Sequence, residues 1–174
     1  VGHQVLHALQ LFRNRYRVTV VDADAYSFGL YTEASRFLVP SAASPDYIPS
    51  MRMLVARERI QVVIPGTEIE LKVLAAHKAE IEAEGCLLLV NPSPVVELCQ
   101  NKFLLARWLE ENGFDSPDTA DGHHWRELAA RRGYPLIAKP CSGSSGSRNV
   151  SILASEEEVL RYLVAARPPQ VATT

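Results

Sequence analysis

A lysine followed closely by a run of serines and glycines is the part of this sequence best suited to chemistry. Lys139 ends a short apolar run, and two residues later the chain continues with Ser and Gly alone. Such a loop can bring several backbone N–H groups and hydroxyls close to an anion, because it carries no bulky side chain. With the fixed charge of Lys139, it suits the phosphates of a nucleoside triphosphate. The candidate loop residues are Ser142, Gly143, Ser144, Ser145, Gly146 and Ser147.

The same loop also fits a simpler role, as a solvated connection between two strands of a hairpin. It is not a P-loop, because the lysine precedes the glycines and the G-x-x-x-x-G-K-[ST] spacing is absent. It is not a dinucleotide-binding fingerprint either, because a strand follows it where that fingerprint requires a helix. The flanking apolar runs, 136–138 and 150–153, predict a clasp of two antiparallel strands around the loop.

Lys102 is a second candidate for contact with an anion. It begins a predicted helix, directly after the capping residue Asn101, at the helix end where a cation is electrostatically disfavoured. A lysine in that position can serve an anionic ligand, although an exposed lysine there costs so little that simple solvation fits as well. From its position alone, both interpretations of Lys102 remain open.

Acidic side chains follow two of the predicted strands. Asp22 and Asp24 come after one strand, and Glu68 and Glu70 come after another. Ligands of open parallel sheets bind at the carboxyl ends of strands, where an acid can hold a ribose. That role requires a preceding glycine loop, of which Gly2 alone is present. Turn formation and helix capping therefore explain these acids better.

The remaining polar and aromatic residues predict no metal site or nucleophile. His123 and His124 are adjacent and not four residues apart on a helix, so a surface loop is expected. Trp108 shares helical spacing with Leu104 and Leu105, which predicts a core position. The sequence therefore identifies no catalytic residue and no metal ligand.

Composition sets limits on the class of protein. The 174 residues include 47% hydrophobic and 22% charged residues, with a formal net charge of −2. This charge gives no general attraction to nucleic acid or to anionic membranes. Apolar runs stay well below the roughly 20 residues that span a membrane. The three cysteines, Cys86, Cys99 and Cys141, form no disulfide or zinc pattern and fit reduced thiols in a cytoplasm.

Alternating strands and helices predict an α/β fold with a doubly wound parallel sheet in the first half. The strands are expected at 18–21, 37–39, 62–64 and 86–90, and one long helix at 68–84, with Gly85 as its terminator. A Pro-rich break at 91–94 predicts two parts, residues 1–92 and 93–174. The second part is expected to contain a helical stretch at 94–112 broken at Asn101, a helix at 125–132 and a last helix from 156. Because the chain begins within a predicted helix, without a preceding strand, we expect it to be a fragment.

Five sequence stretches in order resemble the ATP-grasp superfamily, most closely its carbamoyl-phosphate-synthase-like branch. They are the Asn-Lys pair at 101–102, the turn at 113–119, the Pro-to-Lys-Pro stretch at 134–140, the Ser/Gly loop, and the upstream stretch at 62–71. Residues 1–9 resemble the end of the first glycine turn and helix of the preceding Rossmann-like domain. The resemblance implies a pre-ATP-grasp domain at 1–92 that lacks its first strand. It also implies the truncated N-terminal part of an α+β ATP-grasp domain at 93–174.

The resemblance also implies a function. Such enzymes are ATP- and Mg²⁺-dependent ligases that activate a carboxylate as an acyl phosphate, which an amine or related nucleophile attacks. Lys102 and Lys139 would contact the ATP phosphates, and the Ser/Gly loop would close over them. Asn149 departs from the pattern, standing where glycine is common. The metal ligands and the adenine hinge would lie beyond Thr174, so the fragment alone is expected to be inactive.

Two other functions remain open from the sequence. One is a non-catalytic Rossmann-like module that binds a nucleotide or metabolite, and the other is an NAD-dependent oxidoreductase resting on Gly2 and Asp22. For a ligase, the partners would be a small-molecule carboxylate and an amine, and assembly into a homo-oligomer is left open. The identity of the two substrates cannot be read from these residues.

Overall fold

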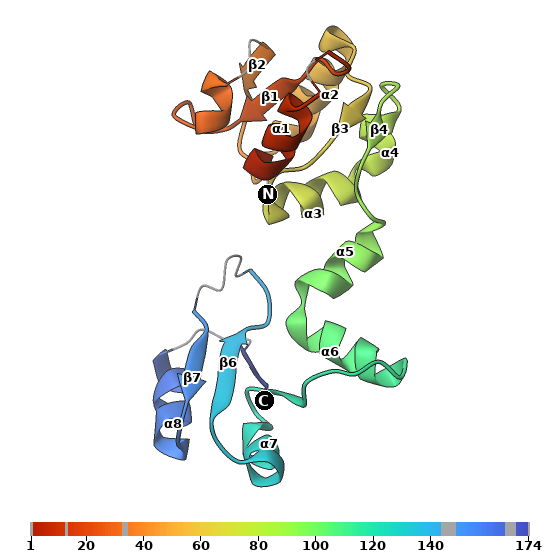
Figure 1. Cartoon of the computed structure of the whole chain (residues 1–174). Helices are drawn as coiled ribbons and strands as arrows, with labels where there is room; N and C mark the ends of the chain where they lie inside the picture. Colours follow the sequence, from red (N-terminus) through yellow and green to blue (C-terminus); the bar gives the residue numbers. More distant parts are fainter. Residues whose placement is uncertain (1, 13, 33–34, 144–148, 166–169, 174) are drawn as a thin grey trace. The chain divides into compact units, whose positions relative to one another are not determined.

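The computed structural model describes residues 2–12, 14–32, 35–143, 149–165 and 170–173. The chain divides into two compact units, Val1–Ser93 and Pro94–Thr174, coloured from red to green and from green to blue in Figure 1. Each unit has its own hydrophobic core.

The first unit alternates helices with short strands. Its elements are α1 (Gly2–Gln10), β1 (Thr19–Asp22), the 3₁₀ helix η1 (Phe28–Tyr31), β2 (Ser35–Leu38), α2 (Tyr47–Glu58), β3 (Val62–Val63), α3 (Glu68–Ala76), α4 (Lys78–Glu82) and β4 (Leu87–Leu88). β1 pairs with β2 and β3 pairs with β4, both in parallel. Parallel pairing and the α/β class are thus confirmed. The described strands form two two-stranded sheets, where the sequence predicted a single one.

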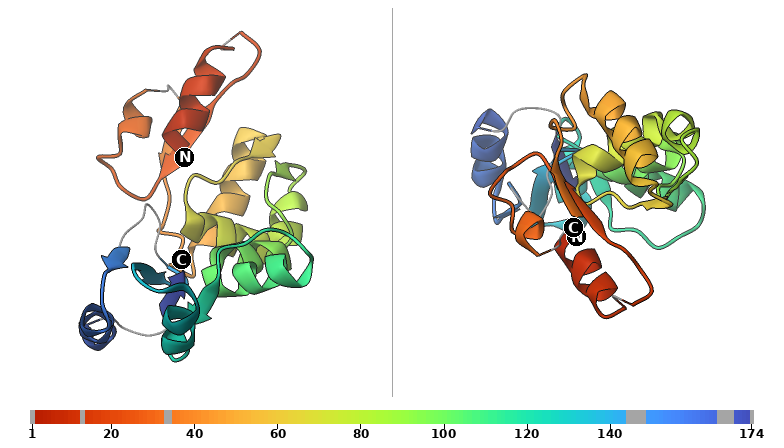
Figure 2. Two further views of the ribbon diagram at one scale, coloured as in Figure 1. Left: turned by 60° about the horizontal axis from the view of Figure 1, so that its bottom comes forward. Right: turned by 90° about the horizontal axis from the view of Figure 1, so that it is seen from above.

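The core of the first unit lies between α2, α3, α4 and the strands β3 and β4. In α2, Ile48, Met51 and Val55 follow helical spacing and are all buried, so one stripe of the helix faces inward. α2 packs beside α4, as both views in Figure 2 show. Ile81 of α4 and Leu88 of β4 are fully buried in the same cluster. This packing holds α2, α3 and α4 in place around the core of the first unit.

The long helix predicted at 68–84 is interrupted at His77, which ends α3 and precedes α4. The His77 backbone has φ −109° and ψ 21°, outside the helical range. Its N–H still donates to the carbonyls of Val73 and Leu74, at 3.2 Å each. The helix ends at Glu82, two residues before the predicted end, with Ala83 as its C-cap. Gly85 closes the turn that follows: it has a φ of 87°, a value that favours glycine, and its N–H donates to Glu82 O at 2.9 Å.

The second unit joins a pair of helices to an antiparallel sheet. Its elements are α5 (Ser93–Gln100), α6 (Lys102–Glu111), β5 (Thr119–Asp121), α7 (Trp125–Arg132), β6 (Leu136–Pro140), β7 (Ser151–Leu153), α8 (Glu156–Ala165) and β8 (Gln170–Thr173). The strand order is β5-β8-β6-β7, and every described pairing is antiparallel. The predicted clasp of antiparallel strands around the Ser/Gly loop is therefore present, as β6 and β7.

The two faces of this sheet differ. Leu136 and Ala138 of β6 and Leu153 of β7 are buried with residues of α7 and α8 in one cluster, so both helices cover the same face (Figure 1). Side chains alternate along a strand, which places Ile137 and Lys139 on the opposite face. Ile152, the partner of Ile137 in the ladder, is 71% exposed. This second face, the open face, is exposed at Ile152 of β7 and half-buried at Ile137 and Lys139 of β6.

One prediction about the core of this unit is wrong. Trp108 is 42% exposed and Leu104 is 50% exposed, and α6 contains no buried residue. Trp108 instead stacks on Phe114, with ring centroids 6.0 Å apart and planes inclined by 16°. Helical spacing showed that these residues share one side of α6, but it could not show whether another element covers that side.

Candidate functional site

Lys139 lies on the open face of the second sheet. It is half-buried near the end of β6, where its backbone pairs with Val171 of β8. Its neighbour Ala138 points the other way and is only 4% exposed. Lys139 is therefore held by a strand that is paired on both sides, while its ammonium group projects from the face that α7 and α8 leave uncovered.

The backbone of Lys102 contacts the residue that directly precedes the Ser/Gly loop. Its backbone N–H donates to the carbonyl of Cys141, at 2.8 Å. The Asn101 side chain caps the same helix, accepting from the N–H groups of Phe103 and Leu104 at 3.1 Å each. The N-terminus of α6, where the helix dipole is positive, is therefore attached to the residue that precedes Ser142.

The helix cap gives a first prediction. Asn101→Ala is expected to destabilise the second unit by about 1 kcal/mol, because two N–H groups of α6 lose their acceptor. Asn101→Asp keeps an acceptor oxygen and should retain most of the stability. Urea unfolding of the two variants and the unmodified protein measures the difference. Equal losses in both variants would contradict a capping role for Asn101.

Cys141 lies near both Lys102 and Asp121, a grouping that the sequence did not single out. Cys141 is buried, and this burial raises the pKa of its thiol. The charge of Asp121 raises that pKa further, whereas the charge of Lys102 lowers it. Asp121 and Lys102 thus each lie within electrostatic reach of Cys141. No local pattern could have indicated this, because the three residues come from separate elements.

Only the first two residues of the candidate loop are described, and both are exposed. Gly143 has a φ of 71°, which favours glycine, and a Cβ placed on it would meet no atom within 4 Å. Ser144, Ser145, Gly146 and Ser147 lie outside the described residues. On the far side of the loop, Asn149 has a φ of 59°, a conformation that asparagine tolerates better than most residues. This explains how Asn149 can stand where glycine is common.

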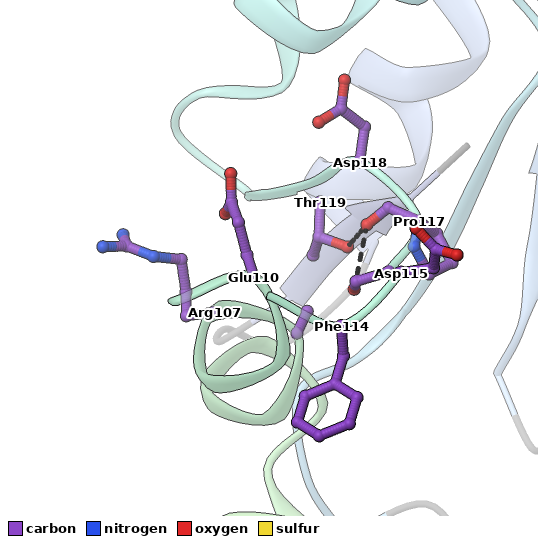
Figure 3. Close-up of a pocket in the computed structure, with 9 residues that line it drawn as sticks. Arg107, Glu110, Phe114, Asp115, Pro117, Asp118 and Thr119 are labelled. Atoms are coloured by element: carbon purple, nitrogen blue, oxygen red, sulfur yellow. Dashed lines mark hydrogen bonds between the residues drawn. The ribbon is translucent and has the colours of Figure 1, made fainter. Parts of the chain in front are cut away.

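A polar cavity of about 190 Å³ lies at the opposite end of α6 (Figure 3). The turn 113–119 forms one wall, and Arg107 and Glu110 of α6 form the other. Within the turn, the hydroxyl of Thr119 donates to the carbonyl of Pro117 at 2.8 Å. Arg132 binds Asp118 at 2.7 Å and thereby lowers the pKa of that carboxyl. These contacts hold the turn itself, so we assign the cavity a structural role.

Glu70 acts as a structural residue at the carboxyl end of β3. Its Oε2 accepts from the N–H of Gly66 at 3.1 Å and from the hydroxyl of Thr67 at 3.0 Å. Thr67 Oγ1 in turn accepts from the N–H of Glu70 at 3.2 Å, so Thr67 caps the N-terminus of α3. The buried hydroxyl of Tyr47 donates to Glu70 Oε1 at 3.3 Å. Burial, followed by the neighbouring carboxylate, raises the pKa of Tyr47.

The acids at the end of β1 also shape a turn. Asp22 Oδ1 accepts from the N–H of Asp24, and Asp24 Oδ1 accepts from the N–H of Tyr26, both at 2.9 Å. Gly2 is needed for close packing, because a Cβ on it would lie 3.3 Å from the Cα of Gly66. Turn formation, as favoured from the sequence, accounts for the described contacts of Asp22 and Asp24.

The histidine pair lies in a surface turn, as expected. His124 Nδ1 is 2.8 Å from Asp121 Oδ1, and both histidines are exposed. Among the described residues, no three His, Cys, Asp or Glu side chains form a group that could hold a metal ion. Within the same part of the chain, no helix is both long and apolar enough to cross a membrane.

Comparison with known proteins identifies relatives of the whole chain. The family model described as PylC-like, N-terminal domain, matches residues 1–89, just over half of the sequence. The formate-dependent phosphoribosylglycinamide formyltransferase of Burkholderia mallei (strain SAVP1) is 32% identical over 174 residues. That alignment covers 95% of this chain and 40% of the enzyme. The chain therefore spans about two fifths of the length of this relative.

Two solved structures share the fold across nearly the whole chain. The ADP complex of purK, an N5-carboxyaminoimidazole ribonucleotide synthetase, has a TM-score of 0.72 at 18% identity, covering 97% of this chain and 43% of that one. The biotin carboxylase domain of Hydrogenobacter thermophilus 2-oxoglutarate carboxylase, in complex with MgADP, ADP and bicarbonate, has a TM-score of 0.65 at 17% identity. It covers 99% of this chain and 41% of that one. At such identities the likeness establishes a shared fold.

Proposed function

The chain belongs to the family of PylC-like N-terminal domains within the ATP-grasp superfamily, and from this premise we propose that it is the ATP-binding part of a carboxylate–amine ligase. The observation that carries the proposal is the contact between Lys102 N–H and the carbonyl of Cys141. This contact joins the positive end of α6 to the start of the Ser/Gly loop, and β6 presents Lys139 just before that loop. We assign residues 1–92 to a pre-ATP-grasp domain and 93–174 to the N-terminal part of an ATP-grasp domain.

The described residues fit a triphosphate. Lys139 projects from the open face of the sheet, and Ser142 and Gly143 are exposed, so their backbone and hydroxyl donors are accessible. We propose that Lys139 and Lys102 bind the phosphates, and that the loop from Ser142 to Ser147 covers them through its N–H groups. The solved structures with ADP and MgADP support ATP and Mg²⁺ as the nucleotide and metal. We assign the Mg²⁺ ligands to the phosphates and to residues outside this chain.

The chemistry proposed for the full-length protein is phosphoryl transfer from ATP to a carboxylate, followed by attack of an amine on the acyl phosphate. Positive charge and fixed N–H donors around the phosphates lower the barrier by stabilising charge that develops on their oxygens. The Burkholderia relative is a formate-dependent enzyme, which supports a small carboxylate as one substrate. Free thiols at Cys86, Cys99 and Cys141 support a cytoplasmic location.

The proposal is tested on the full-length protein by measuring ADP release with Mg²⁺, with formate or a panel of other small carboxylates, and with glycine or a panel of other amines. We expect release of ADP that requires a carboxylate and increases when an amine is supplied. Hydroxylamine should trap an activated carboxylate as a hydroxamate, which is measured by its colour with ferric ion.

Two outcomes would contradict the ligase. Binding of ATP without any carboxylate-dependent ADP release would favour the non-catalytic nucleotide-binding module. Failure to bind ATP in calorimetric titration, with NAD bound instead, would favour the oxidoreductase. Omission of Mg²⁺ provides the matched control, since ADP release should then fall to the background rate.

A further inference from the structure

A larger cavity, of about 540 Å³, lies in the first unit and shares no residue with the nucleotide site. It is lined by residues of α2 and by residues on either side of the break between α3 and α4. Its volume falls within the range of small-molecule sites in proteins, about 300–1,000 Å³. Ile48, Pro49 and Val73 provide its apolar lining.

Two residues of opposite charge line the cavity, Arg52 of α2 and Glu80 of α4, and each is part of an ion pair. On α2, Arg52 donates from Nε to Glu84 Oε1 at 2.9 Å, and its Nη2 lies 2.8 Å from the same oxygen. A guanidinium group has five N–H donors, so Glu84 leaves others available for a ligand. On α4, Glu80 Oε1 is 2.7 Å from His77 Nδ1, and its second oxygen makes no described contact.

These charges are accessible to a ligand from solvent. The side chains of Arg52 and Glu80 are 45% and 51% exposed. Ion pairs at such exposure contribute little to stability, so a ligand can rearrange them at small cost. A purely anionic ligand would pair with Arg52 but be repelled by Glu80. A purely cationic ligand would pair with Glu80 but be repelled by Arg52.

We propose that this cavity binds a zwitterionic α-amino acid with an apolar side chain. The carboxylate pairs with Arg52, the ammonium group pairs with Glu80, and the side chain lies against Ile48, Pro49 and Val73. Arg52 and Glu80 then each bind a group of opposite charge on the ligand, and the ligand covers the apolar lining of the cavity. The site is separate from ATP binding and does not depend on the ligase reaction.

The position of the cavity links it to the carboxyl end of β3. Ile48 follows Tyr47 directly, and Val73 lies one helical turn after Glu70. Tyr47 and Glu70 join α2 to α3 by the hydrogen bond of 3.3 Å described above. A ligand bound between α2 and α3 would therefore stabilise the same packing of these helices as the Tyr47–Glu70 hydrogen bond. We infer that the ligand acts as an effector.

The test is calorimetric titration of L-leucine into the full-length protein without nucleotide. Two analogues each carry one of its charges: 4-methylpentanoate lacks the ammonium group, and 3-methylbutylamine lacks the carboxylate. We expect L-leucine to bind at least tenfold more tightly than either analogue. Arg52→Gln and Glu80→Gln should each weaken L-leucine binding at least fivefold. Arg57→Gln, on the same helix but outside the cavity, should leave it unchanged.

Three results would overturn the proposal: no measurable binding of L-leucine, equal binding of the two analogues and L-leucine, or unchanged affinity in both cavity variants. The analogue series uses the unmodified protein, so it decides the matter even if one variant fails to fold. ATP titration into the Arg52→Gln and Glu80→Gln variants should give unchanged affinity, which separates this site from the proposed function.

Discussion

Replacing Leu136 by alanine is expected to lower the free energy of opening of the second unit by about 2–5 kcal/mol. Leu136 is fully buried and belongs to the cluster in which the sheet meets α7 and α8. Its truncation removes apolar contacts and leaves a cavity, because close-packed neighbours relax only partially. Hydrogen–deuterium exchange of peptides from β6 and β7 measures this free energy for the second unit alone.

Ile152→Ala is the matched control for Leu136→Ala. Ile152 lies on the neighbouring strand of the same sheet but on its open face, with 71% of its surface exposed. Its truncation should change the opening free energy by no more than about 0.5 kcal/mol. A comparable loss in both variants would contradict the assignment of one covered and one open face, on which the placement of Lys139 depends.

Local signals in the sequence are sufficient to predict much of the second unit. Asn101 is a predicted helix cap, and it accepts two N–H groups there, because capping depends on residues only two or three positions away. The apolar runs around the Ser/Gly loop are likewise predicted as antiparallel strands. β6 and β7 pair with each other, and only that loop separates them in the sequence.

Non-local structure is harder to predict. β5 escapes prediction because it has three residues, Thr119–Asp121, and only Ala120 is buried. Its partner β8 comes about fifty residues later in the chain, so no turn signal connects the two strands. The exposure of Trp108 escapes prediction for a related reason. Spacing identifies one side of a helix, whereas burial depends on which other elements reach that side.

Local sequence signals predict one part of the candidate site, and the other part depends on non-local structure. The sequence identifies Lys102 and Lys139 because a lysine at a helix start and a lysine before a glycine loop are unusual positions. The contact between Lys102 and Cys141, and the influence of Asp121 on Cys141, depend on the folded sheet and helix. Residue types alone could therefore propose a phosphate site but could not place α6 against the loop.

Lys139→Ala is expected to weaken ATP binding to the full-length protein by on the order of 1.5–3 kcal/mol, the contribution of a charge-assisted hydrogen bond. This corresponds to a roughly 10- to 150-fold increase in Kd. Lys139 is half-buried on the open face of β6, where nearby protein reduces the screening of its charge. Calorimetric titration of ATP with Mg²⁺ measures the change, and Lys102→Ala should weaken binding in the same direction.

Lys72→Ala is the matched control for Lys139→Ala, because Lys72 is an exposed lysine on α3 in the first unit. It removes the same charge and should leave the Kd for ATP unchanged. The difference between wild type and Lys139→Ala should also shrink as salt is added, since the Debye length falls from about 10 Å at 0.1 M to about 3 Å at 1 M. Folding should be preserved, because the ammonium group of Lys139 lies outside the core cluster. Equal ATP affinity in wild type and Lys139→Ala would rule out the phosphate clasp and leave the Ser/Gly loop as a simple hairpin connection.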